Sequence, residues 1–408
     1  MELHPVERGL HVFWLLGPLI LLIERSPADL WLTLLALAFV FRSLICRDGG
    51  WLKEFWVRAA FVFWAACLLA SAMSSDPLYS LGEATVWFRF PLFAMASAFW
   101  LGRDKRILYM MLITTTLGLL LMCGILLAEV LIEGQKGGRL EWPYGDKVSG
   151  NYLAKVGLPV FTIMVALAVS IKGRLAAVCG LLSLITLLFS LMTGERINFL
   201  IRACGGMLAG LIWKPKWRRY TVLVLVEILA VVIVFHAAPK TGERFVNNFV
   251  SQIKINDNSD YYRAMAPGVM AFQQAPIFGI GTANLRNLCP EVIGQKLDGD
   301  IEDNLFETLE CQPHPHNYYL QIAGETGLVG LITGVVFLTS IVWTCFKASI
   351  GKRENVVLAT AWVIPFGLFW PVTSTADFFG QWNNIFMWSA VALALAATNL
   401  RGRVSIGR

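Results

Sequence analysis

Apolar residues occur in long runs along nearly the whole chain, and short polar connections separate these runs. An α-helix needs roughly 17 to 22 apolar residues to cross about 30 Å of hydrocarbon, and we find about twelve such runs. The pattern therefore predicts an all-α polytopic membrane protein of about twelve transmembrane helices. The approximate centres of these helices are Leu16, Leu35, Ala65, Met95, Leu119, Met164, Leu184, Met207, Val226, Val335, Val363 and Leu393.

One long polar segment, residues 238–315, interrupts this pattern between the ninth and tenth predicted spans. It is too long for a simple connector and too short for a large separate enzyme domain, so we expect a mainly helical cap over the bundle. Residues 263–272 predict a short helix within it, and residues 277–282 predict a tight glycine turn. The predicted domains are 1–237 with spans one to nine, 238–315 as the cap, and 316–408 with spans ten to twelve.

The cysteines of the chain differ in their predicted surroundings. Cys289 and Cys311 lie in the long polar segment, where an oxidising compartment favours a disulfide between them. The remaining cysteines fall in or near apolar runs, which is typical of packing residues.

Composition and charge add an orientation to this picture. With 56% hydrophobic and 15% charged residues, the chain is not a set of soluble domains. The first apolar run lacks a small-residue cleavage site, so we expect it to remain as a span. Lys and Arg concentrate in alternate connections, which predicts that these connections and both termini are cytoplasmic and that the 238–315 segment faces outside. The net charge of +6 then follows from topology, without nucleic-acid binding.

Several polar residues on the predicted outer face are candidates for catalysis. His316 lies where the long polar segment meets a span, and an imidazole there is suited to act as a general base or, alternatively, to cap or anchor the helix. Asp377, in the last outer connection, either orients His316 through Nδ1 or caps the final span. Asn317 either orients a substrate or caps a helix. His314 and nearby carboxylates have a poor spacing for a metal site.

Cations on the same face indicate an anionic substrate. Arg196 lies at an outer helix end, Arg263 opens the helical part of the cap, and Arg139 and Lys155 flank an outer connection. Guanidinium groups bind phosphate oxygens bidentately, so together these residues favour a lipid diphosphate. The alternative is that Arg196 pairs with Glu195 or reaches lipid headgroups.

The same residues carry a resemblance to a known family. His316-Asn317, followed after nine residues by Gly327 and after two more by Gly330, resembles the signature of the O-antigen ligase and polymerase superfamily. Arg196 is similar to the arginine that this superfamily has at an outer helix end, and Arg263 followed by a helix and a glycine turn fits the same pattern. The resemblance extends to the polytopic architecture and is specific from about Thr193 to Gly330.

The resemblance implies a GT-C-like membrane glycosyltransferase of lipopolysaccharide biosynthesis. Such a ligase transfers a glycan from undecaprenyl diphosphate to lipid A-core at the periplasmic face of the bacterial inner membrane, with inversion and without a metal or other cofactor. The resemblance implies that His316 is the general base and that Arg196 and Arg263 bind the diphosphate. Alternatives are a polymerase or a protein O-oligosaccharyltransferase of the same superfamily. A membrane transporter is a further alternative, which the apolar midplanes of the predicted spans disfavour.

Overall fold

The architecture is that of a helical bundle, seen in a computed structural model that describes residues 5–145, 149–253, 260–294, 314–352, 354–371 and 376–400. Within these ranges the regular elements are α-helices and short 3₁₀ or π turns, and none is a β-strand. The prediction of an all-α fold is confirmed for this part of the chain.

The first half of the chain folds into α1 (Pro5–Leu15), α2 (Gly17–Ile20), α3 (Arg25–Ile45), η1 (Gly50–Lys53), α4 (Phe55–Ala72), α5 (Pro77–Trp87), α6 (Arg89–Ala96), η2 (Ser97–Leu101), α7 (Lys105–Ile132), α8 (Ser149–Asn151), η3 (Tyr152–Val156), α9 (Leu158–Ser170) and α10 (Arg174–Met192). The second half contains α11 (Arg196–Ile212), α12 (Trp217–Ala237), α13 (Pro239–Ile253), α14 (Asp260–Gln274), α15 (Leu285–Gly294), α17 (Tyr318–Ser349), α18 (Val356–Thr360), α19 (Val363–Leu368) and α20 (Gln381–Thr398).

Several of these helices are suited to cross a membrane. In the described residues, seven stretches are long and apolar enough: α3, α4, the stretch Pro77–Leu101, α7, α10, α12 and α17. If the bent helix pair Ser149–Val156 and Leu158–Ser170 is counted as one span, the described residues contain up to eight candidate spans. Eleven of the predicted span centres lie inside helices, whereas Leu16 lies at the junction of α1 and α2. The chain is thus a multi-pass membrane protein, and the number twelve stays a prediction.

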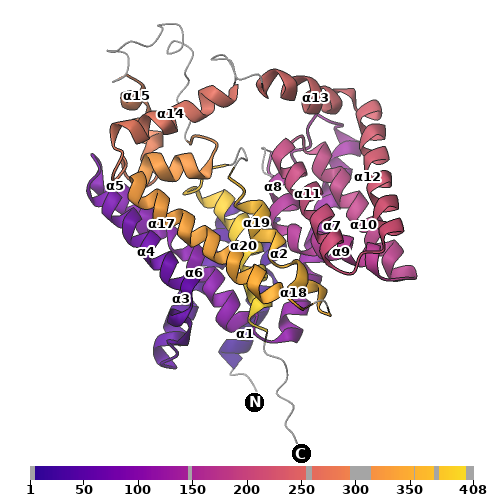
Figure 1. Ribbon diagram of the computed structural model, residues 1–408, viewed down its shortest axis with the longest axis horizontal. Coiled ribbons are helices and arrows are strands. Elements are labelled where there is room, and N and C mark those ends of the chain that lie inside the picture. Colours follow the sequence, from indigo (N-terminus) through magenta and orange to yellow (C-terminus); the bar gives the residue numbers. More distant parts are fainter. Residues whose placement is uncertain are drawn as a thin grey trace, which may run out of the picture.

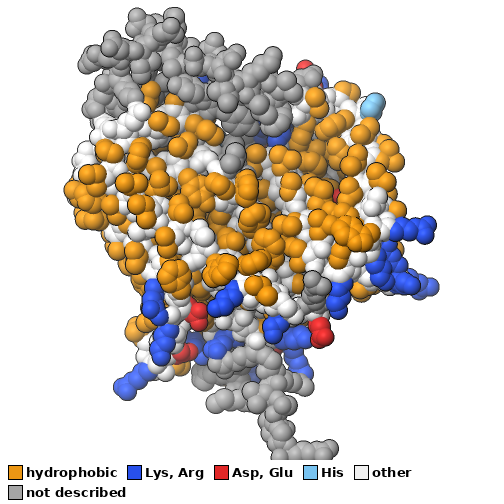
Figure 2. All heavy atoms as spheres, viewed as in Figure 1, with side chains coloured by type: hydrophobic (Ala, Val, Ile, Leu, Met, Phe, Trp, Pro, Cys, Tyr) orange, Lys and Arg blue, Asp and Glu red, His pale blue; other side chains and the backbone are white. Residues whose placement is uncertain are grey.

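The two ends of the bundle differ. Helices α13, α14 and α15 lie together at one end, which we call the cap end, and α1 lies toward the other end (Figure 1). Figure 2 shows an apolar belt across the face in view, with most of the visible Lys and Arg side chains at or below its lower edge, away from the cap end. This distribution is the one that the positive-inside rule describes for a cytoplasmic face, and the orientation itself stays a prediction.

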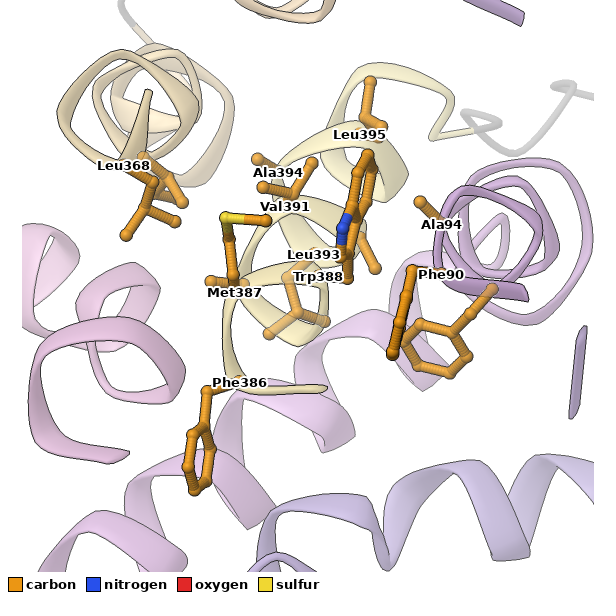
Figure 3. Packing of buried hydrophobic residues seen from close by; sticks show 14 of the residues in the cluster. Phe90, Ala94, Leu368, Phe386, Met387, Trp388, Val391, Leu393, Ala394 and Leu395 are labelled. Atoms are coloured by element: carbon orange, nitrogen blue, oxygen red, sulfur yellow. The ribbon is translucent and has the colours of Figure 1, made fainter. Parts of the chain in front are cut away.

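Helix α20 is the centre of the hydrophobic core. From Asn383 to Ala397 every residue of this helix is buried, as expected for a helix that is apolar on all sides. Figure 3 shows Phe90 and Ala94 of α6 on one side of it and Leu368 of α19 on another. Its polar first turn, with Asn383 and Asn384, lies at the cap end and so brings amide side chains to the candidate site.

The cap-end segments follow the predicted pattern locally. The helix expected at 263–272 is α14, and it includes Pro267. The expected glycine turn is also present, with φ angles of 74° at Gly279 and 105° at Gly281 that favour glycine. Both local predictions are confirmed.

Candidate functional site

Two glycine-containing segments join the cap to the start of α17. Helix α17 is kinked at Gly327, where φ is 65° and ψ is −167°. The kink frees backbone groups that pair with the glycine turn: Ile280 N donates to Gly324 O (3.1 Å) and Gly281 N to Glu325 O (2.8 Å). On the other side of the kink, Leu328 N donates to Pro276 O over 2.8 Å. The signature glycines therefore fasten the cap to the helix that begins beside the candidate catalytic histidines.

The residues just before α17 have a constrained backbone. Pro315 is buried and packs on Gly268 of α14, where an added Cβ would lie 2.7 Å from the Pro315 Cβ. His316 adopts a φ of 51°, which is uncommon for a residue with a side chain. Asn317 caps α17, since its Oδ1 accepts from Tyr319 N at 3.0 Å and from Leu320 N at 3.1 Å. The loop thus holds the histidines in one arrangement at the helix start.

His314 and His316 form a pair. Their ring centroids lie 4.4 Å apart. The Nε2 atom of His314 is buried and has no hydrogen-bond partner in the described part of the chain. Burial lowers the pKa of His314 from its ordinary value, and the neighbouring His316 lowers it further, while Asp377 opposes the shift. At neutral pH His314 is therefore an uncharged imidazole.

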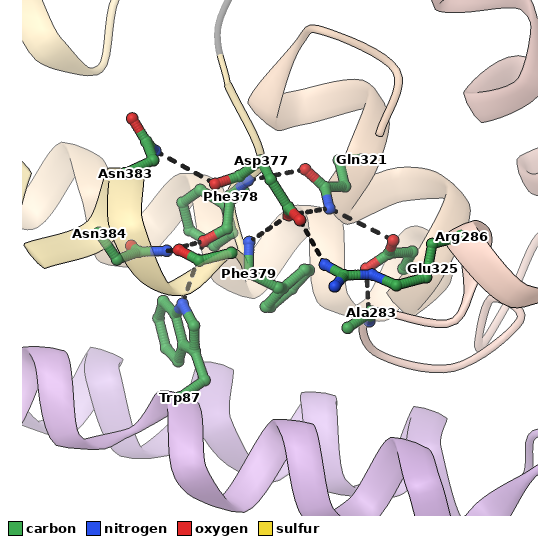
Figure 4. Close-up of polar contacts among 11 residues, drawn as sticks. Trp87, Ala283, Arg286, Gln321, Glu325, Asp377, Phe378, Phe379, Asn383 and Asn384 are labelled. Carbon is green, nitrogen blue, oxygen red and sulfur yellow. Dashed lines mark hydrogen bonds and ion pairs between the residues drawn. The ribbon is translucent and has the colours of Figure 1, made fainter. Parts of the chain in front are cut away.

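Asp377 organises the polar network beside this pair (Figure 4). Its Oδ2 accepts from Arg286 Nη2 at 2.5 Å, and its Oδ1 accepts from Gln321 Nε2 at 2.6 Å and from Phe379 N at 2.9 Å. Burial alone would lower the pKa of Arg286, but neighbouring acidic groups, Asp377 first, raise it above its ordinary value. The carboxylate is thus held by these three donors, and its bond to His316 Nδ1 stays a prediction.

A second carboxyl group extends the network toward the glycine turn. Gln321 also donates to Glu325 Oε1 over 3.3 Å, and Glu325 Oε2 accepts from Ala283 N over 2.7 Å. Ala283 has a φ of 56° and lies between the glycine turn and α15. The network therefore fixes the segment from which Arg286 reaches Asp377.

A cavity of about 660 Å³ opens beside Asp377 and His314. Its walls come from the start of α3, the α5–α6 junction, α8, α15 and the start of α20. The polar and charged lining residues are Arg25, Asp29, Glu83, Arg89, Asn151, Arg286, His314, Asp377, Gln381 and Asn383. The aromatic lining residues are Trp87, Phe90, Phe379, Trp382 and Phe386. We call this cavity the cap-end pocket.

The charges of the cap-end pocket are balanced. Its lining contains three arginines and three carboxylates. Two of the arginines are paired within the chain: Arg89 Nη2 lies 2.9 Å from Asp29 Oδ1, and Arg286 Nη2 lies 2.5 Å from Asp377 Oδ2. Paired charges, amides and aromatic rings suit a polyhydroxylated ligand better than a strongly anionic one.

Lys155 reaches the pocket through an amide. Its Nζ donates to Asn383 Oδ1, and both side chains are buried. Asn383 Nδ2 in turn donates to Tyr318 Oη at 2.8 Å and to Asp377 O at 3.1 Å. The amide thereby joins the predicted Lys155 to the Asp377 segment.

A group of cations lies beyond the pocket, around the start of α11. Gly194 has a φ of 71°, and a Cβ there would lie 2.7 Å from Arg139 Cγ and 3.3 Å from Arg244 Cδ. Arg244 Nε donates to Gly194 O at 2.9 Å. Burial lowers the pKa of Arg139, whereas the charge of Glu195 opposes this and that of Arg196 adds to it. We call Arg139, Arg196 and Arg244 the arginine cluster.

An asparagine links the arginine cluster to the cap-end pocket. Asn198 Nδ2 donates to Glu195 Oε2 and also to Asn151 Oδ1, the latter over 3.2 Å. Asn151 lines the pocket, and Glu195 lies among the arginines. The side chain of Asn198 therefore connects the two groups of residues.

The structure does not bring all predicted residues to one point. His314 and Asp377 line the pocket, whereas Arg263 lies on α14, which packs against α17. Cys289 is disulfide-bonded, while Cys311 lies outside the described residues, so their pairing stays a prediction. In the described residues no group of three or more His, Cys, Asp or Glu side chains is arranged for a metal, and the metal-free mechanism stays a prediction.

Sequence reasoning missed several residues of the site, namely Arg25, Arg89, Asn151, Arg244, Arg286, Gln321 and Asn383. Arg286 follows the glycine turn by only five residues, which is the one local signal for it. The others lie on helices whose sequence carries no such signal.

Comparison with known families agrees with this geometry. Residues 181–335 match the family model described as O-Antigen ligase. This segment is similar to the O-antigen ligase superfamily. It contains Arg196, Arg263, the histidine pair and Gly327. In a comparison with curated proteins, no sequence matches this chain.

The segment matched by the family model supplies only part of the site. It carries the arginines of α11 and α13, the histidine pair and Arg286. The facing walls of the cap-end pocket, with Arg25, Asp29, Arg89 and Asp377, lie outside the matched residues.

Proposed function

We propose that this protein is an O-antigen ligase. It transfers a glycan from undecaprenyl diphosphate to a hydroxyl of lipid A-core at the periplasmic face of the bacterial inner membrane, with inversion at the anomeric carbon and without a metal. In this reaction the acceptor oxygen bonds to the anomeric carbon while the bond to the diphosphate oxygen breaks. The hydroxyl proton goes to a base, and the diphosphate leaves with the bonding electrons.

His316 is the proposed base. Two imidazoles whose centroids lie 4.4 Å apart repel each other when both are protonated, so the pair favours holding a single proton. Burial keeps His314 uncharged, which leaves His316 to accept the proton. His314, with its unbonded Nε2 among the described residues, is suited to bind a sugar hydroxyl in the pocket.

The cap-end pocket is the proposed site of the acceptor sugar. Its arginines are balanced by carboxylates, so an added phosphate would have to compete with Asp29 and Asp377. Sugar hydroxyls instead accept and donate hydrogen bonds without breaking these pairs. Trp87 and Trp382 add aromatic faces on which a sugar ring is able to stack.

The arginine cluster and Arg263 are the proposed site of the donor diphosphate. Arg139 lies near Arg196, Glu195 and Glu141, and Arg244 contacts Gly194, so three arginines exceed two carboxylates there. Guanidinium groups facing a leaving diphosphate stabilise the charge that grows on it in the transition state, by roughly 2 to 4 kcal/mol for each contact made there. This positive charge takes the place that a divalent cation has in other transferases.

The observation that carries the proposal is the juxtaposition of unlike surfaces at the cap end. Asn198 links a charge-balanced pocket beside an uncharged imidazole to a cluster of arginines, and Arg196, Arg244 and the histidine pair lie within the matched segment, whereas Arg139 lies outside it. A transferase that joins a sugar hydroxyl to a diphosphate-linked glycan needs both surfaces next to each other.

The test is transfer by the full chain in proteoliposomes that contain undecaprenyl-diphosphate glycan and lipid A-core, with a chelator present. We expect wild type to glycosylate lipid A-core and His316→Ala to lower the rate by about 100-fold or more. His236→Ala is the matched control, because His236 lies exposed near the end of α12. Unchanged transfer by His316→Ala would exclude it as the base, and lengthening of the lipid-linked donor alone would instead identify a polymerase.

A further inference from the structure

A second cavity lies far from the candidate site, on the flank of the bundle. It is a groove of about 650 Å³ between α10 and α12. Gly173, Ala177 and Gly180 form its floor, and Val222 and Val226 form its opposite wall. Helix α12 has no buried residue, so the groove lies at the surface that the apolar belt of the molecule presents to lipid.

One end of this groove is cationic. Arg218 and Arg219, in the first turn of α12, line it there. Arg218 is exposed, whereas the Nη1 atom of Arg219 is buried and has no hydrogen-bond partner in the portion of the chain that the structure describes. The first backbone N–H groups of α12 add partial positive charge at the same place. An apolar groove with an unsatisfied cationic end matches an amphiphile with an anionic head.

The position of the cationic end decides which amphiphile fits. α10 runs from Arg174 to Met192, next to the arginine cluster, and α12 runs from Trp217 toward α13, which carries Arg244. Arg218 and Arg219 therefore lie at the end of these helices opposite to the candidate site. A donor lipid whose diphosphate reaches the arginine cluster cannot place that diphosphate on Arg219, so the occupant comes from the other leaflet.

We propose that this groove is a binding site for an anionic glycerophospholipid of the leaflet opposite to the candidate site. One acyl chain lies along Ala177, Gly180 and Val226, and the headgroup phosphate bonds Arg218 and Arg219. Basic pockets between helices at a membrane surface bind anionic headgroups in this way. The bound lipid fills the space between α10 and α12 and so supports α12, which packs on the bundle without burying a residue of its own.

The test is lipid retention by the purified full chain, measured by native mass spectrometry with phosphatidylglycerol and phosphatidylcholine as probes. We expect wild type to retain phosphatidylglycerol in preference to phosphatidylcholine. The double variant Arg218→Gln/Arg219→Gln should bind phosphatidylglycerol roughly 25-fold more weakly, about fivefold for each arginine. The matched control is Lys214→Gln/Lys216→Gln, which removes the same charge nearby but outside the groove lining, and it should bind as wild type does.

A steric variant makes the test independent of charge. A Cβ at Gly180 has only ordinary contacts, 3.7 Å from Ala168 Cβ and 4.0 Å from Leu223 Cδ1, so Gly180→Leu fits the backbone of α10 and fills the groove. It should also weaken phosphatidylglycerol retention. Equal retention by wild type and the double arginine variant, equal binding of phosphatidylcholine, or displacement of phosphatidylglycerol by undecaprenyl phosphate would each overturn the proposal. None of these measurements depends on transferase activity.

Discussion

Replacing Gly327 by alanine is the most direct perturbation of the joint between the cap and the bundle. A Cβ at this position would lie 2.2 Å from Ile277 O and 2.5 Å from Phe278 N. Both are backbone atoms, so the clash is relieved only if the glycine turn moves away from α17. The φ of 65° with a ψ of −167° is in addition a conformation that residues with a side chain avoid.

The energetic cost of this substitution follows from the backbone hydrogen bonds beside Gly327. Moving Ile277 breaks the bonds from Leu328 N to Pro276 O and from Val329 N to Ile277 O, which contribute about 1 kcal/mol each. Backbone strain at residue 327 adds about 2 kcal/mol. We therefore expect Gly327→Ala to lower the free energy of unfolding by about 4 kcal/mol and the melting temperature by about 5 °C.

The assay is thermal unfolding of the detergent-purified protein together with its transfer rate. Gly124→Ala is the matched control, because Gly124 lies in α7 and an added Cβ meets no atom within 4 Å. This control should be neutral or slightly stabilising, since alanine is a better helix former. If Gly327→Ala melts within about 2 °C of wild type, the contact of residue 327 with the glycine turn does not stabilise the protein.

Three further predictions concern single side chains. Asp377→Asn removes the charge that holds Arg286, and because Arg286 is partly exposed we expect only about a tenfold loss in kcat/KM for transfer. Burial lowers the pKa of His314 from 6.5 to about 4, so the unfolded chain takes up a proton first as pH falls. This pKa difference contributes at most roughly 3 kcal/mol to the free energy of unfolding; the contribution is present above pH 6.5 and is lost as the pH falls toward 4. His314→Gln should therefore make the melting temperature depend less on pH in this range. Arg202→Met leaves Leu153 O without its donor and should lower the melting temperature more than Arg202→Lys does.

The helices of this chain could be predicted because apolar run length alone decides where they form. The bends within these helices could not be predicted from the sequence. The span around Met164 is bent by 56° between η3 and α9, and the carbonyl of Leu153 in this bend accepts from Arg202, a residue 49 positions later. Such a bend depends on a partner that local sequence does not reveal, and π turns of this kind are frequent at functional sites.

The candidate site likewise has a part that the sequence predicted and a part that it did not. Local motifs indicated the histidine pair and the glycine turn, because both lie in short segments with unusual residue types. Arg286 and Asp377 are 91 positions apart, and Gln321 reaches Asp377 across 56. Their partnership is set by how α15, α17 and α20 pack, so the sequence suggested Asp377 as a candidate but gave it a different partner.

The two surfaces at the cap end also bear on how the acceptor is selected. If a phosphate bound Arg89 or Arg286, Asp29 or Asp377 would lose its ion-pair partner, which costs free energy. The arginine cluster is able to bind a phosphate without this cost, because its positive charge is in excess. Arg196 and Arg244 of the cluster lie inside the matched segment 181–335, whereas Arg139 and the pocket residues Asp29, Arg89 and Asp377 lie outside it. We infer that the part of the chain shared with the family handles the diphosphate, and that the walls contributed by α3, the α5–α6 junction and the start of α20 select the acceptor. Exchanging residues on those walls should therefore alter KM for the acceptor and leave KM for the lipid-linked donor unchanged.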